Sequence, residues 1–260
     1  FILATKCRAL TKADMEAEIA TSLKNLRTDH IELFQFHNPS MEGLQTILAP
    51  GGAMEALLEA KDKGVVGHIG ITAHLAAVFE AALDIPEIET IMFPYNIVEQ
   101  QGKELIDRCA AAGKSFIDMK PLAGGAIEDG RLALRYVLSN PAVTVAIPGM
   151  ATVDELNANV AGAANIDPLT PEEEAAELAK PGDHPEWEIG LPAAIQKDID
   201  AYLEGVRSQV TYLDCLWDEL YGSINASQWG WDISKEQADY LRQKYLFEPE
   251  ESFLPTDSML

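Results

Sequence analysis

The sequence predicts an α/β fold of the (β/α)8 TIM-barrel type, incomplete here at about six βα units, with an all-helical segment after it. Three observations lead to this prediction. Short apolar runs alternate with segments whose apolar residues recur at helical spacing. Strict alternation of this kind is typical of a parallel sheet covered by helices. No G-x-G-x-x-G motif follows an early strand, which disfavours a Rossmann fold.

The first strand–helix–strand unit sets the pattern. Residues 2–6 form an apolar run that stops at Lys6, and residues 31–37 form another that stops at His37. Between them, residues 11–27 have helical periodicity and open with Thr11-x-x-Asp14, a start signal for a helix. Two strands joined through a helix are parallel, so Lys6 and His37 are expected at the same end of neighbouring strands. In a (β/α) barrel that end carries the active site.

The later units repeat the rhythm after a longer connection that follows Pro39. Strands are expected at 65–72, 88–96, 114–119 and 143–147, and helices at 54–63, 75–83, 102–112, 131–138 and 152–164. The last of these helices opens with a Thr152-x-x-Glu155 capping box. Because a barrel of this type closes with eight units, two are expected to be missing. The apolar strand that begins at Phe1 suggests a true start upstream.

The alternation of strands and helices ends near residue 165. A helix is expected at 169–179, then a Pro- and Gly-rich run, then helices at 193–209, 212–221 and 232–247 and a loose tail. We therefore expect a barrel portion at 1–178, a linker at 179–194 and a small acidic helical segment at 195–260.

Charge and cysteine content exclude several classes of partner and site. The net charge of −23 argues against nucleic acid or an anionic membrane surface as a partner. Residues 1–165 hold 13 Lys and Arg against 21 Asp and Glu, whereas the shorter remainder holds 6 against 21. Three widely spaced cysteines argue against a metal or iron–sulfur site and favour a reduced, cytoplasmic setting. No apolar run approaches the length of a membrane span.

Several segments, in order, resemble the aldo-keto reductase family over about residues 1–178. They are ATKCRALTKADMEAEIATSLKNLRTDHIELFQFHNP, GHIGITAH, MKPLAGG, ALRYVLSNPAVTVAIPGM and the helix that contains Glu155 and Asn159. GHIGITAH and MKPLAGG are most similar to a subgroup that often carries a C-terminal ferredoxin-like segment. The cysteines of that segment are absent here, so no cluster is predicted.

The resemblance implies a TIM barrel that uses NADPH or NADH to reduce small-molecule aldehydes or ketones. The family's catalytic tetrad is Asp, Tyr, Lys and His, and Lys6 and His37 match the last two. The Asp and Tyr are expected upstream of Phe1. Hydride delivery to a carbonyl leaves an alkoxide, so a proton donor is needed at the oxygen. A cation beside a tyrosine lowers its pKa from about 10, which suits Lys6, while His37 orients the carbonyl oxygen.

The resemblance also implies cofactor contacts along the later units. The matching positions are Thr72, His74, Lys120, Pro121, Leu122, Gly149, Met150 and Asn159. Lys120-Pro121-Leu122 matches the turn that wraps the pyrophosphate. Glu155 stands where the family usually has an arginine, and it would repel a 2′-phosphate. NADH is therefore at least as plausible as NADPH.

Other interpretations stay open. His74 is as consistent with a helix-start residue as with a cofactor contact, and Lys120 could simply be exposed. A second hypothesis is a non-catalytic cofactor-sensing or protein-interaction module built on a reductase remnant, with the open sheet edges as pairing sites. A third is a Schiff-base lyase that uses Lys120. The sequence leaves the substrate and the oligomeric state open.

Overall fold

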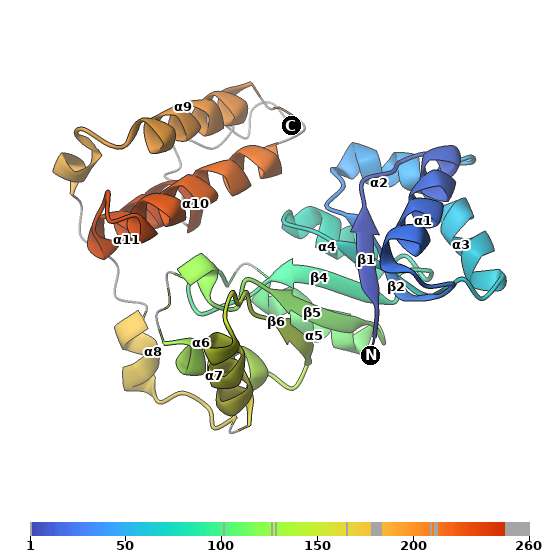
Figure 1. The fold of residues 1–260 in the computed structure, drawn as a ribbon, viewed down its shortest axis with the longest axis horizontal. Coiled ribbons are helices and arrows are strands. Elements are labelled where there is room, and N and C mark those ends of the chain that lie inside the picture. Colours follow the sequence, from blue (N-terminus) through green and yellow to red (C-terminus); the bar gives the residue numbers. More distant parts are fainter. Residues whose placement is uncertain are drawn as a thin grey trace. The chain divides into compact units, whose positions relative to one another are not determined.

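The computed structural model has a parallel sheet with helices between its strands, followed by helices (Figure 1). It describes residues 2–100, 102–125, 127, 129–164, 166–177, 184–208, 210 and 213–247. The strands are β1 Ala4–Cys7, β2 Ile31–His37, β3 Val66–Thr72, β4 Thr90–Pro94, β5 Ser115–Met119 and β6 Val143–Ile147. The helices up to β6 are α1 Lys12–Leu26, α2 Met41–Leu48, α3 Ala53–Asp62, α4 Ala76–Leu83, α5 Lys103–Ala111 and α6 Gly130–Leu138.

All strand pairs in the sheet are parallel, in the order β1-β2-β3-β4-β5-β6. Sequential parallel strands with intervening helices are what an incomplete (β/α)8 barrel requires. The predicted fold class is therefore confirmed.

Helix α2 lies in the stretch after Pro39, where the sequence predicts only a connection. The Ser40 side chain accepts a hydrogen bond from the Gly43 amide and caps this short helix. Leu44 and Ile47 are buried, with 3% and 1% of each residue exposed. Burial of these two side chains supplies the stabilisation that the eight-residue helix lacks on its own.

One face of the sheet packs against helices to form the main core. Its strand residues are fully buried and mostly aromatic or branched: Phe34, Phe36, Ile69, Ile71, Ile91, Phe93 and Phe116. Phe79 of α4 stacks on Phe116 with ring centroids 5.7 Å apart and lies 5.2 Å from Phe93. The opposite face carries a smaller apolar cluster of Leu33, Met92 and Ile117, with Met119 packed beside it. The helices pack against the first face. The second face carries this smaller apolar cluster together with polar side chains.

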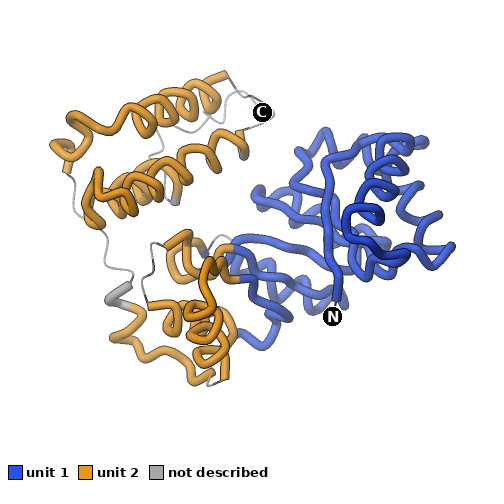
Figure 2. Tube along the Cα trace, viewed as in Figure 1, with its two compact units in different colours: residues 1–95, 100–119, 140–147 blue, residues 96–99, 120–139, 148–260 orange. Residues whose placement is uncertain are grey.

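The chain divides into two compact units (Figure 2). Unit 1 comprises residues 1–95, 100–119 and 140–147, and so contains the whole sheet. Unit 2 comprises residues 96–99, 120–139 and 148–260. The predicted boundary at residue 178 falls inside unit 2, and residues 178–183 lie outside the described part. The division into barrel, linker and helical segment stays a prediction.

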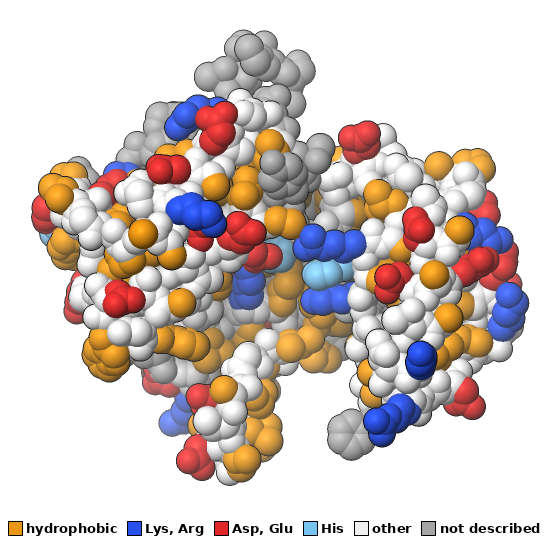
Figure 3. Space-filling view, turned by 45° about the horizontal axis from the view of Figure 1, so that its top comes forward, with side chains coloured by type: hydrophobic (Ala, Val, Ile, Leu, Met, Phe, Trp, Pro, Cys, Tyr) orange, Lys and Arg blue, Asp and Glu red, His pale blue; other side chains and the backbone are white. Residues whose placement is uncertain are grey.

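The surface reflects the acidic composition. Figure 3 shows acidic side chains scattered over the surface, and a histidine with basic side chains on either side of it. Among the described residues, no helix is long and apolar enough to cross a bilayer.

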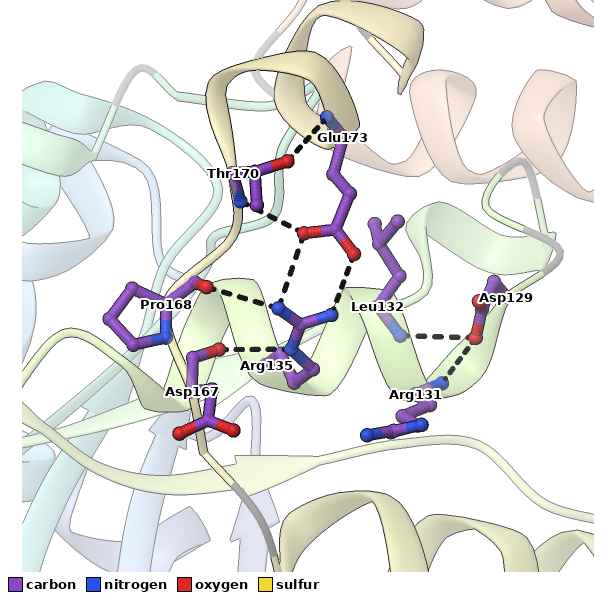
Figure 4. Close-up of polar contacts among 8 residues, drawn as sticks. All are labelled: Asp129, Arg131, Leu132, Arg135, Asp167, Pro168, Thr170 and Glu173. Atoms are coloured by element: carbon purple, nitrogen blue, oxygen red, sulfur yellow. Dashed lines mark hydrogen bonds and ion pairs between the residues drawn. The ribbon is translucent and has the colours of Figure 1, made fainter.

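The first α-helices of unit 2 are α6, α7 Val153–Ala163 and α8 Pro171–Glu177. Arg135 of α6 forms a two-pronged ion pair with Glu173 of α8, at 2.9 and 3.2 Å, and donates to the Asp167 and Pro168 carbonyls (Figure 4). Glu173 in turn accepts from the Thr170 amide, and the Thr170 hydroxyl accepts from the Glu173 amide. This reciprocal cap places Thr170 directly before the first turn of α8, inside the stretch where a helix was expected. Arg135 therefore ties α8 to α6.

The helices α9 Ala193–Arg207, α10 Leu213–Trp229 and α11 Lys235–Arg242 form a bundle around a buried apolar cluster. Helix α10 runs eight residues beyond the predicted end at Tyr221. Gly222 does not end it because Leu220 and Ile224, on either side, are fully buried in the cluster. From residue 184 on, the predicted linker packs on this bundle: Glu188 accepts hydrogen bonds from Tyr240 and Tyr245, each at 2.6 Å.

Candidate active site

Lys6 and His37 lie at the carboxyl ends of β1 and β2. Lys6 is paired in register with Gln35, and His37 lies two residues beyond Gln35 in the same strand. Side chains two apart on a strand point to the same face, and so do partners in register. Lys6 and His37 therefore project from one face of the sheet, where Lys6 is exposed and His37 is half-buried.

The loops after β2 and β3 are joined by hydrogen bonds. The Asn38 amide donates to the Thr72 hydroxyl at 3.0 Å, and the His74 amide donates to the Asn38 side-chain oxygen at 3.0 Å. Asn38 has a positive φ of 50°, a conformation that asparagine tolerates better than most residues. Because His37 and Thr72 are also paired in register, these contacts bring His37, Thr72 and His74 together in unit 1.

A buried row of residues next to Lys6 carries polar side chains that were not predicted from the sequence. Gln35, Gly70 and Thr90 are paired in register across β2, β3 and β4. Gly70 leaves the space in which Thr90 and Gln35 approach each other, since a Cβ there would overlap the Thr90 hydroxyl. Within the described residues, the Gln35 Oε1 and Thr90 Oγ1 atoms are buried without a hydrogen-bond partner. The signal available in the sequence was a glutamine two residues before His37 in an otherwise apolar strand.

Lys120 opens a tight turn in unit 2. Its φ is +61°, and Ala123, Gly124 and Gly125 also have positive φ. The Ala123 amide donates to the Lys120 carbonyl at 2.9 Å, and the Asn96 side-chain amide donates to the same carbonyl at 3.0 Å. Non-glycine residues in this region are uncommon and concentrate at functional sites. Pro121 is buried and Leu122 is half-buried in the turn.

The Lys120 ammonium group is surrounded by side chains of α10. Nζ lies 2.8 Å from the Asp218 carboxylate, 4.0 Å from the centroid of the Trp217 ring and 4.6 Å from that of Tyr221. The two rings are stacked, 4.9 Å apart. None of these three residues is among the site residues predicted from the sequence. Aromatic residues at positions i and i+4 of a helix were the signal. A Schiff-base lyase would need a free amine at Lys120, whereas this one is ion-paired.

Glu99 is a buried acid in the same unit. Only 3% of the residue is exposed, and its carboxylate accepts a hydrogen bond from the Asn96 amide at 2.7 Å. Burial raises the pKa of Glu99, while the Asn96 hydrogen bond and the Lys120 charge act in the opposite direction. Burial and the charge of Glu99 also raise the pKa of Tyr221.

The remaining predicted positions lie just before α7 or within it. Gly149 and Met150 are exposed, and a Cβ on Gly149 would meet nothing within 4 Å. The predicted capping box is confirmed, with the Glu155 carboxylate accepting from the Ala151 and Thr152 amides at 2.5 and 3.2 Å. Asn159 is half-buried, and its Oδ1 lies 3.5 Å from where a Cβ on Gly130 would stand. Glu155 thus holds amides at a helix N-terminus that an anion could otherwise use.

The predicted residues fall into two sets. Lys6, His37, Thr72 and His74 belong to unit 1, and Lys120, Pro121, Leu122, Gly149, Met150 and Asn159 belong to unit 2. The roles assigned to them from the resemblance stay predictions. Among the described residues, no group of three or more His, Cys, Asp or Glu side chains is arranged to hold a metal ion.

The comparison with known protein families decides what kind of chain this is. The model of the "Aldo/keto reductase family" matches residues 1–131, half of the 260-residue chain. The chain belongs to the aldo/keto reductase family. This confirms the resemblance at the level of the family. The subgroup with a ferredoxin-like segment is not addressed by the match.

Curated relatives of this aldo/keto reductase chain are distant. An uncharacterized oxidoreductase from Schizosaccharomyces pombe is 22% identical over 57% of this chain and 52% of its own length. Pyridoxine 4-dehydrogenase from Escherichia coli is 23% identical over 59% of each chain. A methylglyoxal reductase from Salmonella typhi is 30% identical over 49% of each chain. The matches thus span only about half to three fifths of these relatives.

Solved structures of the family resemble this chain as well. An aldo-keto reductase from Bacillus halodurans is 26% identical, and the match covers 72% of this chain and 74% of that one. The TM-score is 0.58 for its apo form and 0.59 for its holo form. The structural similarity therefore points to the same family as the sequence match.

Proposed function

We propose that this chain is an NAD(P)H-dependent oxidoreductase that reduces the carbonyl group of small aldehydes or ketones. The observation that carries the proposal is the placement of Lys6 and His37 at the ends of adjacent parallel strands, on one face of the sheet. Family membership supports it. So do the names of two relatives, a pyridoxine 4-dehydrogenase and a methylglyoxal reductase.

The residues of unit 1 suit the protonation of the carbonyl oxygen that follows hydride transfer. The bound nicotinamide ring would supply the hydride. In the proposed mechanism His37 donates a hydrogen bond to the carbonyl oxygen, where negative charge develops. Lys6 places a positive charge beside the proton donor and lowers the pKa of that donor. In the family the donor is a tyrosine, for which residues 1–260 offer no assigned counterpart. We therefore expect this chain alone to reduce carbonyls poorly.

A cofactor is compatible with the groups present. Gln35 and Thr90 offer buried polar atoms that lack partners within the described residues. Thr72 and His74 would contact the nicotinamide end, and Lys120, Pro121 and Leu122 the pyrophosphate. Gly149, Met150 and Asn159 would lie toward the adenosine end. The Glu155 carboxylate already caps the Ala151 and Thr152 amides. That arrangement disfavours a 2′-phosphate there, so we propose NADH as at least equal to NADPH.

The test is an assay of NADH and NADPH oxidation with methylglyoxal, pyridoxal and simple aldehydes. It compares the 260-residue chain with a chain extended upstream. We expect robust turnover only in the extended chain, and we expect Lys6→Met and His37→Ala to lower its kcat/KM by roughly 10²- to 10⁴-fold. The matched control is Lys63→Met, which removes a lysine whose side chain is 70% exposed. Equal, robust turnover by both chains would refute the tetrad argument.

The same experiment addresses the alternative of a non-catalytic module. A fluorescence titration with NADH reports binding separately from turnover. An extended chain that binds NADH but reduces none of the carbonyls would favour the sensing module over the reductase.

A further inference from the structure

Helix α10 contacts the turn at residues 120–125 at several points. Lys120 is held between the Asp218 carboxylate and the stacked rings of Trp217 and Tyr221. Its side chain is only 21% exposed as a result. A lysine at a turn is normally solvated, so this degree of cover is unusual.

Two glycines of the turn are covered by the same helix. A Cβ on Gly124 would overlap the Tyr221 hydroxyl and ring, and a Cβ on Gly125 would lie 3.1 Å from the Trp229 ring. Glycines at a turn can let a phosphate approach the backbone closely. Here that space is taken by aromatic side chains from the chain itself.

Helix α10, whose side chains surround Lys120, is itself packed in the helical bundle. Leu220 and Ile224 of α10 are fully buried in the bundle cluster, and Tyr221 belongs to the same cluster. Helix α10 and the turn both belong to unit 2 (Figure 2). The contact joins residues 98 positions apart in the chain.

Because of their charges, Asp218 and a phosphate group cannot both bind the Lys120 ammonium group. A phosphate seated on Lys120 would lie close to the Asp218 carboxylate, and like charges at that separation repel. Phosphate and Asp218 would therefore compete for one ammonium group.

We propose that α10 is an internal competitor of the dinucleotide, with Asp218, Trp217 and Tyr221 occupying the turn that would otherwise receive its phosphates. The inference rests on the proposed function, because it takes Lys120, Pro121 and Leu122 as the pyrophosphate site. It assigns to the helical segment the regulation of that site. Cofactor binding then requires α10 to withdraw from the turn.

The first measurement needs no cofactor. The 260-residue protein is treated with N-hydroxysuccinimidyl acetate, which acylates amines, and the rate at each lysine is followed by mass spectrometry. We expect Lys120 to react severalfold more slowly than Lys63, whose side chain is 70% exposed. Asp218→Asn should speed the labelling of Lys120. The control Glu219→Gln, which removes the same charge from an exposed neighbour, should not. Labelling of Lys120 as fast as Lys63 would overturn the proposal.

The second measurement is NADH affinity by fluorescence titration. Loss of one charge-assisted hydrogen bond from the competitor should tighten binding by about tenfold in Asp218→Asn and leave Glu219→Gln unchanged. Equal affinity in all three proteins overturns the competition and leaves the reductase intact. Absence of NADH binding in every variant overturns the competition and the proposed cofactor together. Slow labelling of Lys120 would then locate the failure in the cofactor assignment.

Discussion

At the residue scale, Glu99 shows how burial sets the protonation of an acid. Burial raises the pKa of its carboxyl group, and neither the Asn96 hydrogen bond nor the Lys120 charge reverses that shift. The folded protein therefore holds this proton to higher pH than the unfolded chain does. The stability that the protonated acid contributes is fully present below the unfolded pKa, near 4.3, and is lost as the pH rises through the folded pKa.

We therefore expect Glu99→Gln to be more stable than the natural protein at pH 8. The advantage should shrink as the pH falls to 5, because the natural acid regains its proton. The amide side chain of this variant keeps a carbonyl oxygen that can accept from Asn96, so the hydrogen bond is retained. Urea unfolding at both pH values measures the difference. Glu219→Gln, on the exposed surface of α10, changes the net charge equally and should show no such trend. A Glu99→Gln advantage that grows toward pH 5 would contradict the assignment.

At the scale of the element, two glycines in neighbouring helices differ in what surrounds them. A Cβ on Gly222 of α10 would meet nothing within 4 Å. A Cβ on Gly205 of α9 would lie 2.5 Å from a Leu216 methyl carbon and 3.1 Å from one of Val210. Gly205 thus lets the two helices approach, whereas Gly222 only weakens its own helix.

This difference predicts opposite signs for the same substitution. Gly222→Ala should stabilise the protein by about 0.5–1 kcal/mol through helix propensity. Gly205→Ala should destabilise it by about 1–3 kcal/mol, because the extra methyl group overpacks the contact between α9 and α10. Thermal unfolding of the two variants serves as a matched pair. A gain in stability from both would show that the bundle is not packed as described.

At the scale of the whole molecule, the net charge of −23 dominates. Such a charge repels itself in the compact state, and salt screens the repulsion. The screening length falls from about 30 Å at 0.01 M salt to about 3 Å at 1 M. Exposed ion pairs such as Glu80–Arg108 weaken over the same range but contribute little.

We therefore expect the Tm to rise by a few degrees between 20 mM and 500 mM NaCl. Differential scanning calorimetry measures it. The same scan on a variant with three exposed glutamates neutralised, at positions 18, 87 and 219, should start from a higher Tm and rise less. A Tm that falls with salt would mean that attractive ion pairs outweigh the repulsion.

Much of the fold could be predicted because its signals are local. The caps at Thr11 and Thr152 sit where the sequence placed them, since a side chain that bonds an amide three residues on needs no distant partner. Helix α2 and the second half of α10 were missed for the opposite reason. Their stability comes from burial of Ile47 and Ile224 against distant parts of the chain.

The candidate site was predicted in part. The ends of β1 and β2 follow from strand–helix–strand order, so the position of Lys6 and His37 at the same end of neighbouring strands could be expected, whereas their common face came from the observed register. Their catalytic roles stay predictions. The neighbours of Lys120 could not be foreseen, because an aromatic pair at helical spacing shows that a surface exists without showing what it meets.

The sequence by itself determined the element order, the parallel direction of the strands, the caps and the acidic surface. Each of these depends on residues a few positions apart or on composition alone. Only the tertiary structure decided that Trp217, Asp218 and Tyr221 surround Lys120, and that Gln35 and Thr90 share a buried row. The physical reason is that contacts between distant residues depend on how helices and strands pack against one another. The periodicity of a sequence shows which face of an element is apolar, but not which element packs against that face.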